Sequence, residues 1–323
     1  MSLGINKRPR QGDEPSSREI PVEKPIFLSG LGRSGTTLIH SVLAEHPNAN
    51  WLSLFCAKFP KRPAINRWLM HAIEVPLLKI LLKRRFEPLE NYNFWNQYYR
   101  GFFRPCRDLT SADVTVQAKQ SIRRVFSQLQ TRKRNRMLIK TTGMTRIGFL
   151  HNIFPDGKFV HIIRDGRAVA YSRMNVEFWR GWEGRLLWPD ELPHNYRLEW
   201  QKYNFSFVAL AGLEWKANMD LFETVKRENP HISILEVRYE SFCTNPLVEI
   251  KRIAEFCELE WSTRFEDTVR NFYVNSENDQ WKKQLTEEQK TILQDVLYPY
   301  LVRYGYETGG SDAPRPVGEA IIA

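Results

Sequence analysis

The chain has 323 residues, of which 42% are hydrophobic and 13% aromatic, so we expect a globular protein with a large core, as one domain with an elaborated region. Its formal net charge of +10 favours an anionic ligand, a nucleic acid or an acidic membrane surface, without distinguishing among them. The sequence shows no secretory signal, no apolar run of about 18 residues and no C-x-x-C pair among its four cysteines, so we expect a cytoplasmic protein with reduced thiols.

Polar segments containing several Pro, Gly and Ser residues stand at both ends of the chain. Residues 1–24 and 307–323 have the composition of disordered tails. We therefore expect one folded domain over residues 25–306.

Within this domain, short apolar runs alternate with helical patterns. The predicted strands are residues 24–30, 136–140, 157–163 and 231–239, and the predicted helices are 36–47, 144–154, 166–174 and 246–257. Such alternation predicts an α/β protein with three layers, in which helices flank a central parallel sheet on both faces. Residues 60–130 are mainly helical and interrupt the alternation, so we expect a helical cap or insertion there.

The segment FLSGLGRSGTTL follows the first predicted strand and opens the first predicted helix. Gly30 and Gly35 have the spacing of a phosphate-binding loop, but Thr36 occupies the lysine position of that motif. Glycines let successive backbone N–H groups point at one anion, and the helix N-terminus adds partial positive charge. Arg33 can supply the missing cation, and the hydroxyls of Thr36 and Thr37 can donate to phosphate oxygens. We expect an anion cradle; the alternative is a Gly-rich turn that only starts a helix.

A second cation ends the predicted strand KFVHII. A kinase or nucleoside triphosphatase needs Mg²⁺, held in part by an Asp that ends a neighbouring strand. Arg164 stands at that place here, with Asp165 next to it. Ser172 follows about two turns along the next helix, on a face that can return to the same ligand. The pattern favours an anion bound without a metal and leaves a metal-dependent small-molecule kinase as the alternative.

At these residues the sequence resembles the sulfotransferases that use 3′-phosphoadenosine 5′-phosphosulfate (PAPS). GRSGTT looks like the family's 5′-phosphosulfate loop, FPDGKFVHIIRDGRAVAYS like its 3′-phosphate segment, and VRYESFCTNPLVEIKRIAEFCEL like its later strand and helix. The resemblance covers about residues 25–306 and implies a P-loop-like fold, PAPS as co-substrate and no metal. The residues that it assigns to the donor are Gly32, Arg33, Ser34, Gly35, Thr36 and Thr37 for the 5′-phosphosulfate, Arg164 and Ser172 for the 3′-phosphate, Tyr239 for the adenine end, and Lys282 for a segment that closes over the nucleotide.

Sulfuryl transfer is an in-line displacement in which charge develops on the leaving phosphate oxygen, and positioned cations can stabilise that charge. Lys140 ends the predicted strand RMLIK and matches a family lysine close to the transferring group. The resemblance therefore assigns Lys140, together with Arg33, to catalysis. The alternative for Lys140 is a solvated side chain beside a strand.

The general base departs from the family pattern. Cytosolic-type members carry His in a K-T-H segment where this chain has Thr142, and other members use a Glu shortly after the first helix, a stretch without Asp or Glu here. The segment FEPLENYNFW offers Glu87 and Glu90, of which Glu90 resembles an acidic position before an aromatic pair in related bacterial sequences. We predict Glu90 as the base, with His40 as a second candidate.

Other histidines lie in regular patterns. His151 and His161 fall in a predicted helix and a predicted strand, so we expect structural roles for both. A chain that kept the cradle without a working base would be a non-catalytic nucleotide-binding or membrane-surface protein, and this is the third hypothesis.

Three further segments each admit two interpretations. Residues 68–86 form either a buried cap helix, which we favour, or a contact with an anionic membrane or a lipid acceptor. The basic run 131–136 lacks interleaved aromatic residues, which favours a solvated connection over a nucleic-acid site. The aromatic segment 178–204 either borders the acceptor pocket or packs a helical layer. The predicted partner is a small-molecule, sugar or lipid acceptor, with no nucleic acid.

Overall fold

The computed structural model describes residues 20–78, 89–103, 107–177, 179, 192–274 and 278–307. Its centre is a sheet of five parallel strands in the order β2-β3-β1-β4-β5. The strands are β1 (Ile26–Gly30), β2 (Ala49–Trp51), β3 (Arg136–Thr142), β4 (Lys158–Ile163) and β5 (Ile234–Arg238). The predicted α/β class is confirmed, and the one strand that the sequence analysis misses, β2, has three residues, too few for a periodicity.

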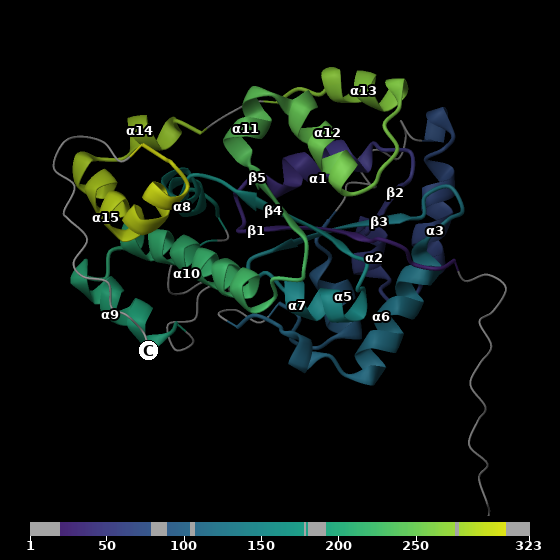
Figure 1. Cartoon of the computed structure of the whole chain (residues 1–323), viewed down its shortest axis with the longest axis horizontal. Coiled ribbons are helices and arrows are strands. Elements are labelled where there is room, and N and C mark those ends of the chain that lie inside the picture. Colours follow the sequence, from purple (N-terminus) through teal and green to yellow (C-terminus); the bar gives the residue numbers. More distant parts are fainter. Residues whose placement is uncertain are drawn as a thin grey trace, which may run out of the picture.

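Side chains alternate between the two faces along each buried strand, and each face is covered by a hydrophobic core. On β1, Ile26 and Leu28 belong to one hydrophobic core and Phe27 to another. We call the first the α1-side core and the second the α10-side core. Figure 1 shows α1, α12 and α13 on one side of the strands and α5, α6 and α7 on the other.

The α1-side core draws residues from α1 (Thr36–Ala44), α3 (Pro63–Ala72), α11 (Tyr239–Thr244), α12 (Pro246–Phe256) and α13 (Thr263–Arg270). The α10-side core draws residues from α2 (Leu54–Lys58), α5 (Tyr92–Tyr98), α6 (Val116–Leu129), α7 (Ile147–Ile153), α8 (Gly166–Met174), α9 (His194–Lys202), α10 (Phe207–Glu228), α14 (Gln280–Gln284) and α15 (Glu287–Arg303). Because β1 lies at the centre of the sheet, its carboxyl end is flanked by those of β3 and β4, and a ligand site is expected at that edge.

The helices begin and face inward for local reasons. In α6, the Thr115 hydroxyl accepts a hydrogen bond from the Ala118 N–H, and Ile122, Phe126 and Leu129 recur at helical spacing on its buried side. In α15, Thr286 and Gln289 cap each other's backbone N–H groups in a capping box.

Helices α3, α5 and α6 fall in the segment 60–130, where helices were expected. Helix α3 buries Leu69 and Met70 but leaves Trp68 64% exposed, so the predicted burial of this cap segment holds for one face of the helix. Residues 79–88 and 104–106 of the segment 60–130 lie outside the described residues. Among the residues that are described, no helix has the length and apolar character needed to cross a bilayer.

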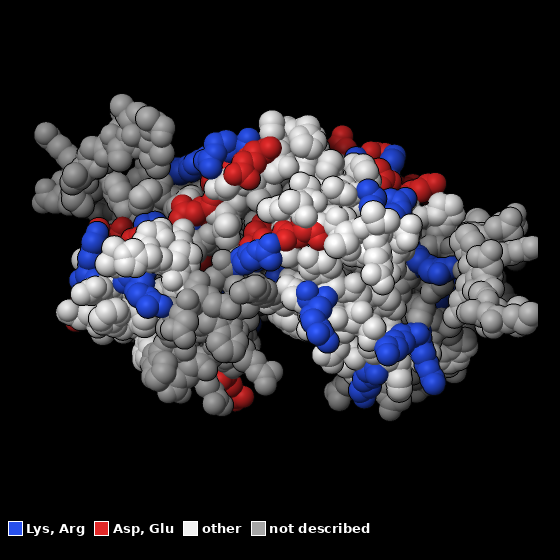
Figure 2. Space-filling view, turned by 90° about the horizontal axis from the view of Figure 1, so that it is seen from below, with Lys and Arg blue, Asp and Glu red and all other residues white. Residues whose placement is uncertain are grey.

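The basic run 131–136 is only in part the solvated connection that was expected, since Arg132 and Lys133 are exposed but other residues of the run are not. Arg134 is buried and donates to the Ala49 carbonyl at 2.8 Å, and Arg136 Nη2 donates to the Cys257 carbonyl at 2.6 Å. These guanidinium groups therefore supply hydrogen-bond donors to backbone carbonyls near the start of β3. On the face shown in Figure 2, Lys and Arg side chains are scattered among uncharged residues and do not join in one continuous band.

The folded region also extends beyond the expected boundary at residue 25. Val22 is buried, and the Lys24 N–H donates to the Asp156 carboxylate at 2.6 Å. These contacts attach residues 22–24 to the domain.

Candidate active site

The chain passes from β1 into α1 through a loop whose backbone is open to an anion. Gly30, Arg33 and Gly35 have φ values of +148°, +77° and +87°. Helix α1 begins at Thr36 with no side-chain hydrogen bond capping it and no acidic residue in its first turn. The first N–H groups of a helix lack intrahelical acceptors and carry the positive end of the helix dipole. The loop therefore has the geometry of an anion cradle.

Tyr239, the first residue of α11, packs against this cradle. A Cβ atom on Gly35 would overlap the Tyr239 ring, so the close approach requires glycine at this position. The guanidinium carbon of Arg164 lies 4.5 Å from the centre of the same ring. The buried ring thus joins the loop to the end of β4.

Lys140 and Glu90, which come from distant parts of the sequence, meet beside the cradle. Lys140 Nζ donates to Thr37 Oγ1 at 2.9 Å and lies 3.5 Å from Glu90 Oε1. Thr142 donates its hydroxyl to Glu90 Oε2 at 2.8 Å. A carboxylate held in this way can accept a proton from a bound hydroxyl, while the ammonium group can stabilise negative charge on the cradle.

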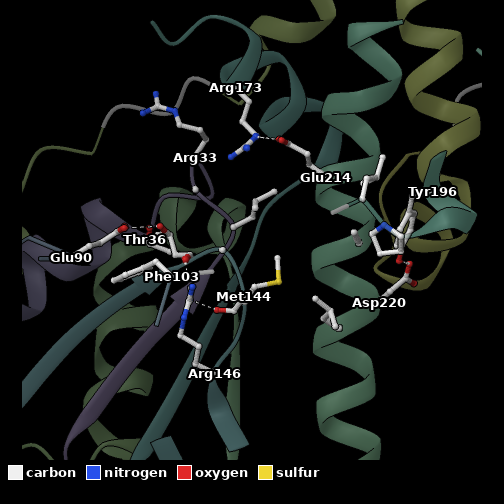
Figure 3. A pocket seen from close by; sticks show the side chains of 18 of the residues that line it. Arg33, Thr36, Glu90, Phe103, Met144, Arg146, Arg173, Tyr196, Glu214 and Asp220 are labelled. Carbon is white, nitrogen blue, oxygen red and sulfur yellow. Dashed lines mark hydrogen bonds and ion pairs between the residues drawn. The ribbon is translucent and has the colours of Figure 1, made fainter. Parts of the chain in front are cut away.

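The predicted 3′-phosphate residues lie on the other side of the loop. Arg33 Nε donates to Ser172 Oγ at 2.9 Å, which brings the loop and α8 together. Arg164 Nη1 donates to the Arg33 carbonyl at 2.9 Å, and its Nε donates to Asn278 at 2.9 Å. Arg33 is among the residues that line the cavity, and Figure 3 shows its side chain extending from the loop away from Thr36.

Asp165, the carboxylate on which a metal-dependent kinase would depend, is committed elsewhere. It is buried, accepts from the Arg167 N–H at 2.9 Å to cap α8, and pairs with the Arg167 guanidinium at 2.8 Å. This geometry turns the carboxylate away from a ligand on the cradle.

A cavity of about 510 Å³ opens beside the cradle, a volume suited to a small organic molecule. Thr36 and Glu90 lie at one end of it, and Tyr196 and Asp220 at the other (Figure 3). Most of the exposed lining is apolar and includes Leu31, Phe103, Met144, Leu192 and Leu221, although Arg146, Arg173 and Glu214 also line the cavity.

Helix α10 forms one wall of the cavity. Its lining residues include Glu214, Ala217, Leu221 and Thr224, whose spacing places them on one face of a helix. Asp220 accepts hydrogen bonds from the hydroxyls of Tyr196 on α9 and Tyr300 on α15. This wall is absent from the sequence-based predictions, although the helical spacing of the four residues is a signal that could have indicated it.

Another pair that the sequence analysis misses is buried between α8 and α10. Arg173 Nε pairs with Glu214 Oε2. The exposed fraction is 6% for the Arg173 side chain and 4% for the Glu214 side chain. Trp179 Nε1 donates to Glu214 Oε1 at 3.3 Å. Burial raises the pKa of Glu214, which the positive charge of Arg173 opposes. Both members of the pair line the cavity.

Several sequence candidates lie away from these groups. His40 is fully buried at 3.4 Å from the Leu138 carbonyl, and burial, aided by Lys140, lowers its pKa to about 3. His40 is therefore a neutral core residue, and its assignment as a candidate base is wrong. Lys282 is half exposed and pairs with Asp279 at 3.0 Å. Glu87 lies outside the described residues.

His161 is buried inside the fold, whereas His151 is partly exposed. His161 bonds to Ser29 Oγ at 2.9 Å and stacks on Phe222 with ring centres 3.6 Å apart. His151 contacts the ring of His231, with centres 5.3 Å apart. In the aromatic segment, Tyr196 lines the cavity and Trp200 is buried in the α10-side core, while Trp182 and Trp188 lie outside the described residues.

Comparison with known proteins gives a consistent family. A model described as the sulfotransferase family matches residues 25–263. The omega-hydroxy-beta-dihydromenaquinone-9 sulfotransferase Stf3 of Mycobacterium bovis is 22% identical over 316 residues, covering 89% of this chain and 76% of that protein. The crystal structure of sulfotransferase STF9 from Mycobacterium avium has a TM-score of 0.55 at 20% identity, over 89% of this chain and 78% of the other. STF1 from Mycobacterium tuberculosis gives 0.52 at 15% identity, over 84% and 76%.

At these identities the structural likeness shows a shared fold, and the family match extends over most of the chain. The predicted family and the predicted reaction, sulfuryl transfer, are confirmed. The chain belongs to the sulfotransferase family.

Proposed function

We propose that this sulfotransferase takes its sulfuryl group from PAPS, bound at the cradle, and transfers it to a hydroxyl of a largely apolar acceptor in the adjacent cavity. The observation that carries the proposal is the group formed by Lys140, Thr37, Glu90 and Thr142, which joins a cation and a carboxylate at the junction of cradle and cavity. Transfer at this junction needs no covalent enzyme intermediate, because the site can position the acceptor hydroxyl against the sulfuryl group and stabilise the charge that develops on the leaving phosphate oxygen.

In this proposal the acceptor hydroxyl gives its proton to Glu90 as its oxygen attacks sulfur. Lys140 stabilises the charge that develops on the leaving phosphate oxygen. Thr142 holds the carboxylate through its 2.8 Å hydrogen bond, and Lys140 is oriented by Thr37.

Ser172 and Arg164 are proposed to hold the 3′-phosphate, with Tyr239 near the adenine end. Their contacts on the outer side of the loop support this assignment. Arg33 and Thr37 keep the assignment to the 5′-phosphosulfate that the family resemblance implies. The backbone of Gly32, Ser34, Gly35 and Thr36 would hold the 5′-phosphosulfate. The proposal includes no metal and a cytoplasmic location; the commitment of Asp165 to Arg167 supports sulfuryl transfer over a magnesium-dependent kinase. Lys282 keeps its proposed role in closing over the nucleotide.

The proposed acceptor is a small molecule or lipid with an apolar body and a reactive alcohol or phenol. The apolar lining between Glu90 and Asp220 supports this class. The name of the mycobacterial relative Stf3 describes a hydroxylated dihydromenaquinone as its acceptor, which points in the same direction.

Calorimetric titration with 3′-phosphoadenosine 5′-phosphate (PAP), the expected product, tests the donor assignment. We expect metal-independent binding to the wild type and at least tenfold weaker binding to Arg164→Ala. Arg132→Ala, which changes an exposed arginine outside the site, is the matched control and should bind as the wild type does.

Circular dichroism checks that Arg164→Ala is folded before its affinity is interpreted. A preference for ATP with Mg²⁺ over PAP would contradict the proposal and support a kinase. Equal PAP affinity of Arg164→Ala and the wild type would remove Arg164 from the donor site.

A further inference from the structure

The Arg173–Glu214 pair lies where the cradle meets the cavity. Arg173 Nη1 is 3.6 Å from the position that a Cβ atom on Gly32 would occupy, so the guanidinium group adjoins the cradle backbone. Figure 3 shows Arg173 reaching from α8 toward Glu214 on α10, above the loop that carries Arg33 and Thr36. The pair thus lies at the donor side of the cavity.

The pair leaves most of the hydrogen-bonding capacity of Arg173 unused. A guanidinium group has five N–H donors, and Glu214 engages the Nε side. Among the residues that the structure describes, none accepts a hydrogen bond from Nη1 or Nη2 of Arg173. In the described part of the chain, Nη1 and Nη2 of Arg173 are not among the fully buried unpaired atoms, so they are accessible from the cavity that Arg173 lines and can donate to a ligand there.

Stability alone does not account for this pair. Taking two charges out of water costs several kcal/mol per ion, and apolar side chains of similar volume often stabilise a fold as well or better. Here the charges are nearly fully buried yet face a cavity beside an anion cradle. A planar guanidinium fork matches the oxygens of a tetrahedral anion.

Lys140 approaches the cradle from β3 and Arg173 from α8. An anion held by the cradle would therefore meet two cations carried by different elements. Arg33, on the loop itself, donates through Nε to Ser172 on α8.

We propose that Arg173 is a further catalytic residue, whose Nη groups donate to the oxygens of the transferring sulfuryl group, and that Glu214 is a positioning residue that orients its guanidinium. This inference rests on the proposed PAPS-dependent function. In the transfer, the bond between sulfur and the phosphate oxygen breaks and the bond between sulfur and the acceptor oxygen forms. The acceptor proton passes to Glu90, PAP leaves with the bonding pair, and Arg173 keeps its protons throughout.

The test compares the affinities for PAPS and PAP, because only PAPS carries the sulfuryl group. Calorimetric titrations without an acceptor are made on the wild type and on Arg173→Met, with Arg132→Met as the control for an exposed arginine. We expect Arg173→Met to bind PAPS at least tenfold more weakly and PAP within about twofold of the wild type. Glu214→Gln, which keeps a hydrogen-bond acceptor for Nε, should give a smaller loss that is also specific to PAPS.

Removal of Arg173 alone leaves Glu214 as a buried carboxylate without its cation, which can unfold the protein. The double variant Arg173→Met/Glu214→Gln removes both charges at similar volume and should fold, with the same selective loss of PAPS affinity. If the double variant binds PAPS and PAP as the wild type does, or loses both equally, the pair is structural or serves the acceptor, and the inference is overturned. A wild type that binds neither nucleotide would instead contradict the proposed function itself.

Discussion

Glu90 is held by one ion pair and one hydrogen bond from two residues of the same strand. Its carboxylate lies between the Lys140 ammonium and the Thr142 hydroxyl, both on β3. Thr142 stands at the histidine position of the K-T-H pattern with which the sequence was compared above, and its hydroxyl bonds to the carboxylate of another segment. The base function has thus moved from the strand to the segment before α5 in the mechanism that we propose.

Replacing Glu90 by Gln, which exchanges one carboxylate oxygen for an amide nitrogen, tests the assignment of Glu90 as the general base. Glu90→Gln keeps an oxygen that can accept from Thr142 but removes the base, so we expect turnover to fall by about 10²–10⁴-fold. PAP affinity should stay within about twofold of the wild type. The measurement is PAP release from PAPS with an acceptor found by screening alcohols and phenols.

Thr142→Val should reduce turnover less than Glu90→Gln does, because it leaves the Glu90 carboxylate in place. It keeps the shape of the side chain but removes the hydroxyl that orients Glu90, and we expect about a tenfold loss, since a hydrogen bond to a charged group contributes about 1.5 kcal/mol or more. Undiminished turnover of Glu90→Gln would assign the base to another residue.

Residues at the ends of strands and in the loop could be predicted, because motif spacing and chain order determine where they lie. Lys140 ends a recognisable apolar run, and Gly35 has a motif spacing. Glu90 was one of two candidates, and its contact with Lys140 depends on how a segment without periodicity folds back onto β3. Arg173 and Glu214 could not be paired from the sequence, because the packing of α8 against α10 is a tertiary property.

Among the elements, α10 connects the acceptor end of the cavity to two neighbouring helices. Asp220 receives the hydroxyls of Tyr196 from α9 and Tyr300 from α15, and thereby ties three helices through one carboxylate. Burial, and then the negative charge of Asp220, raises the pKa of both tyrosines above their usual value.

Alkaline titration tests this three-helix link. Because the folded-state pKa of Tyr300 exceeds the value of about 10 in the unfolded chain, its contribution to stability is complete below that pH and is lost as the pH rises above it. We expect the free energy of unfolding, measured by urea denaturation between pH 8 and 11, to fall above about pH 10.

Tyr300→Phe should be less stable than the wild type at pH 8, because it lacks the hydrogen bond, and should lose less stability on going to pH 11. Tyr273→Phe, which changes a tyrosine that is 81% exposed, should follow the wild-type profile. Identical profiles of Tyr300→Phe and the wild type would show that this hydroxyl does not link stability to pH.

For the molecule as a whole, the layered fold could be predicted because alternating strands and helices permit few arrangements. The order of the strands and the short β2 could not, since strand pairing joins residues far apart in the sequence.

Each of the two cores of this fold contains a buried thiol. Cys56 belongs to the α10-side core and Cys257 to the α1-side core, and burial raises the pKa of each thiol to about 12.

Labelling with a thiol reagent at pH 8, followed by peptide mapping, tests both cores in the intact protein. The thiolate is the reactive form, so we expect Cys243, which is half-buried, to react well before Cys56 and Cys257. In urea all three should react alike. Labelling of Cys56 or Cys257 as fast as Cys243 would show that the corresponding core opens in the native state.

The division of the interior into two cores also bears on how such an enzyme diversifies. The helix that starts at the cradle, α1, is supported by one core, and the helix that lines the cavity, α10, by the other. Substitutions that reshape the cavity wall therefore disturb packing on the side of the sheet opposite to α1. In the function that we propose, substitutions at Ala217, Leu221 or Thr224 of α10 would change the acceptor wall without altering the packing of α1, whereas a substitution at Glu214 would also reach the donor side through Arg173.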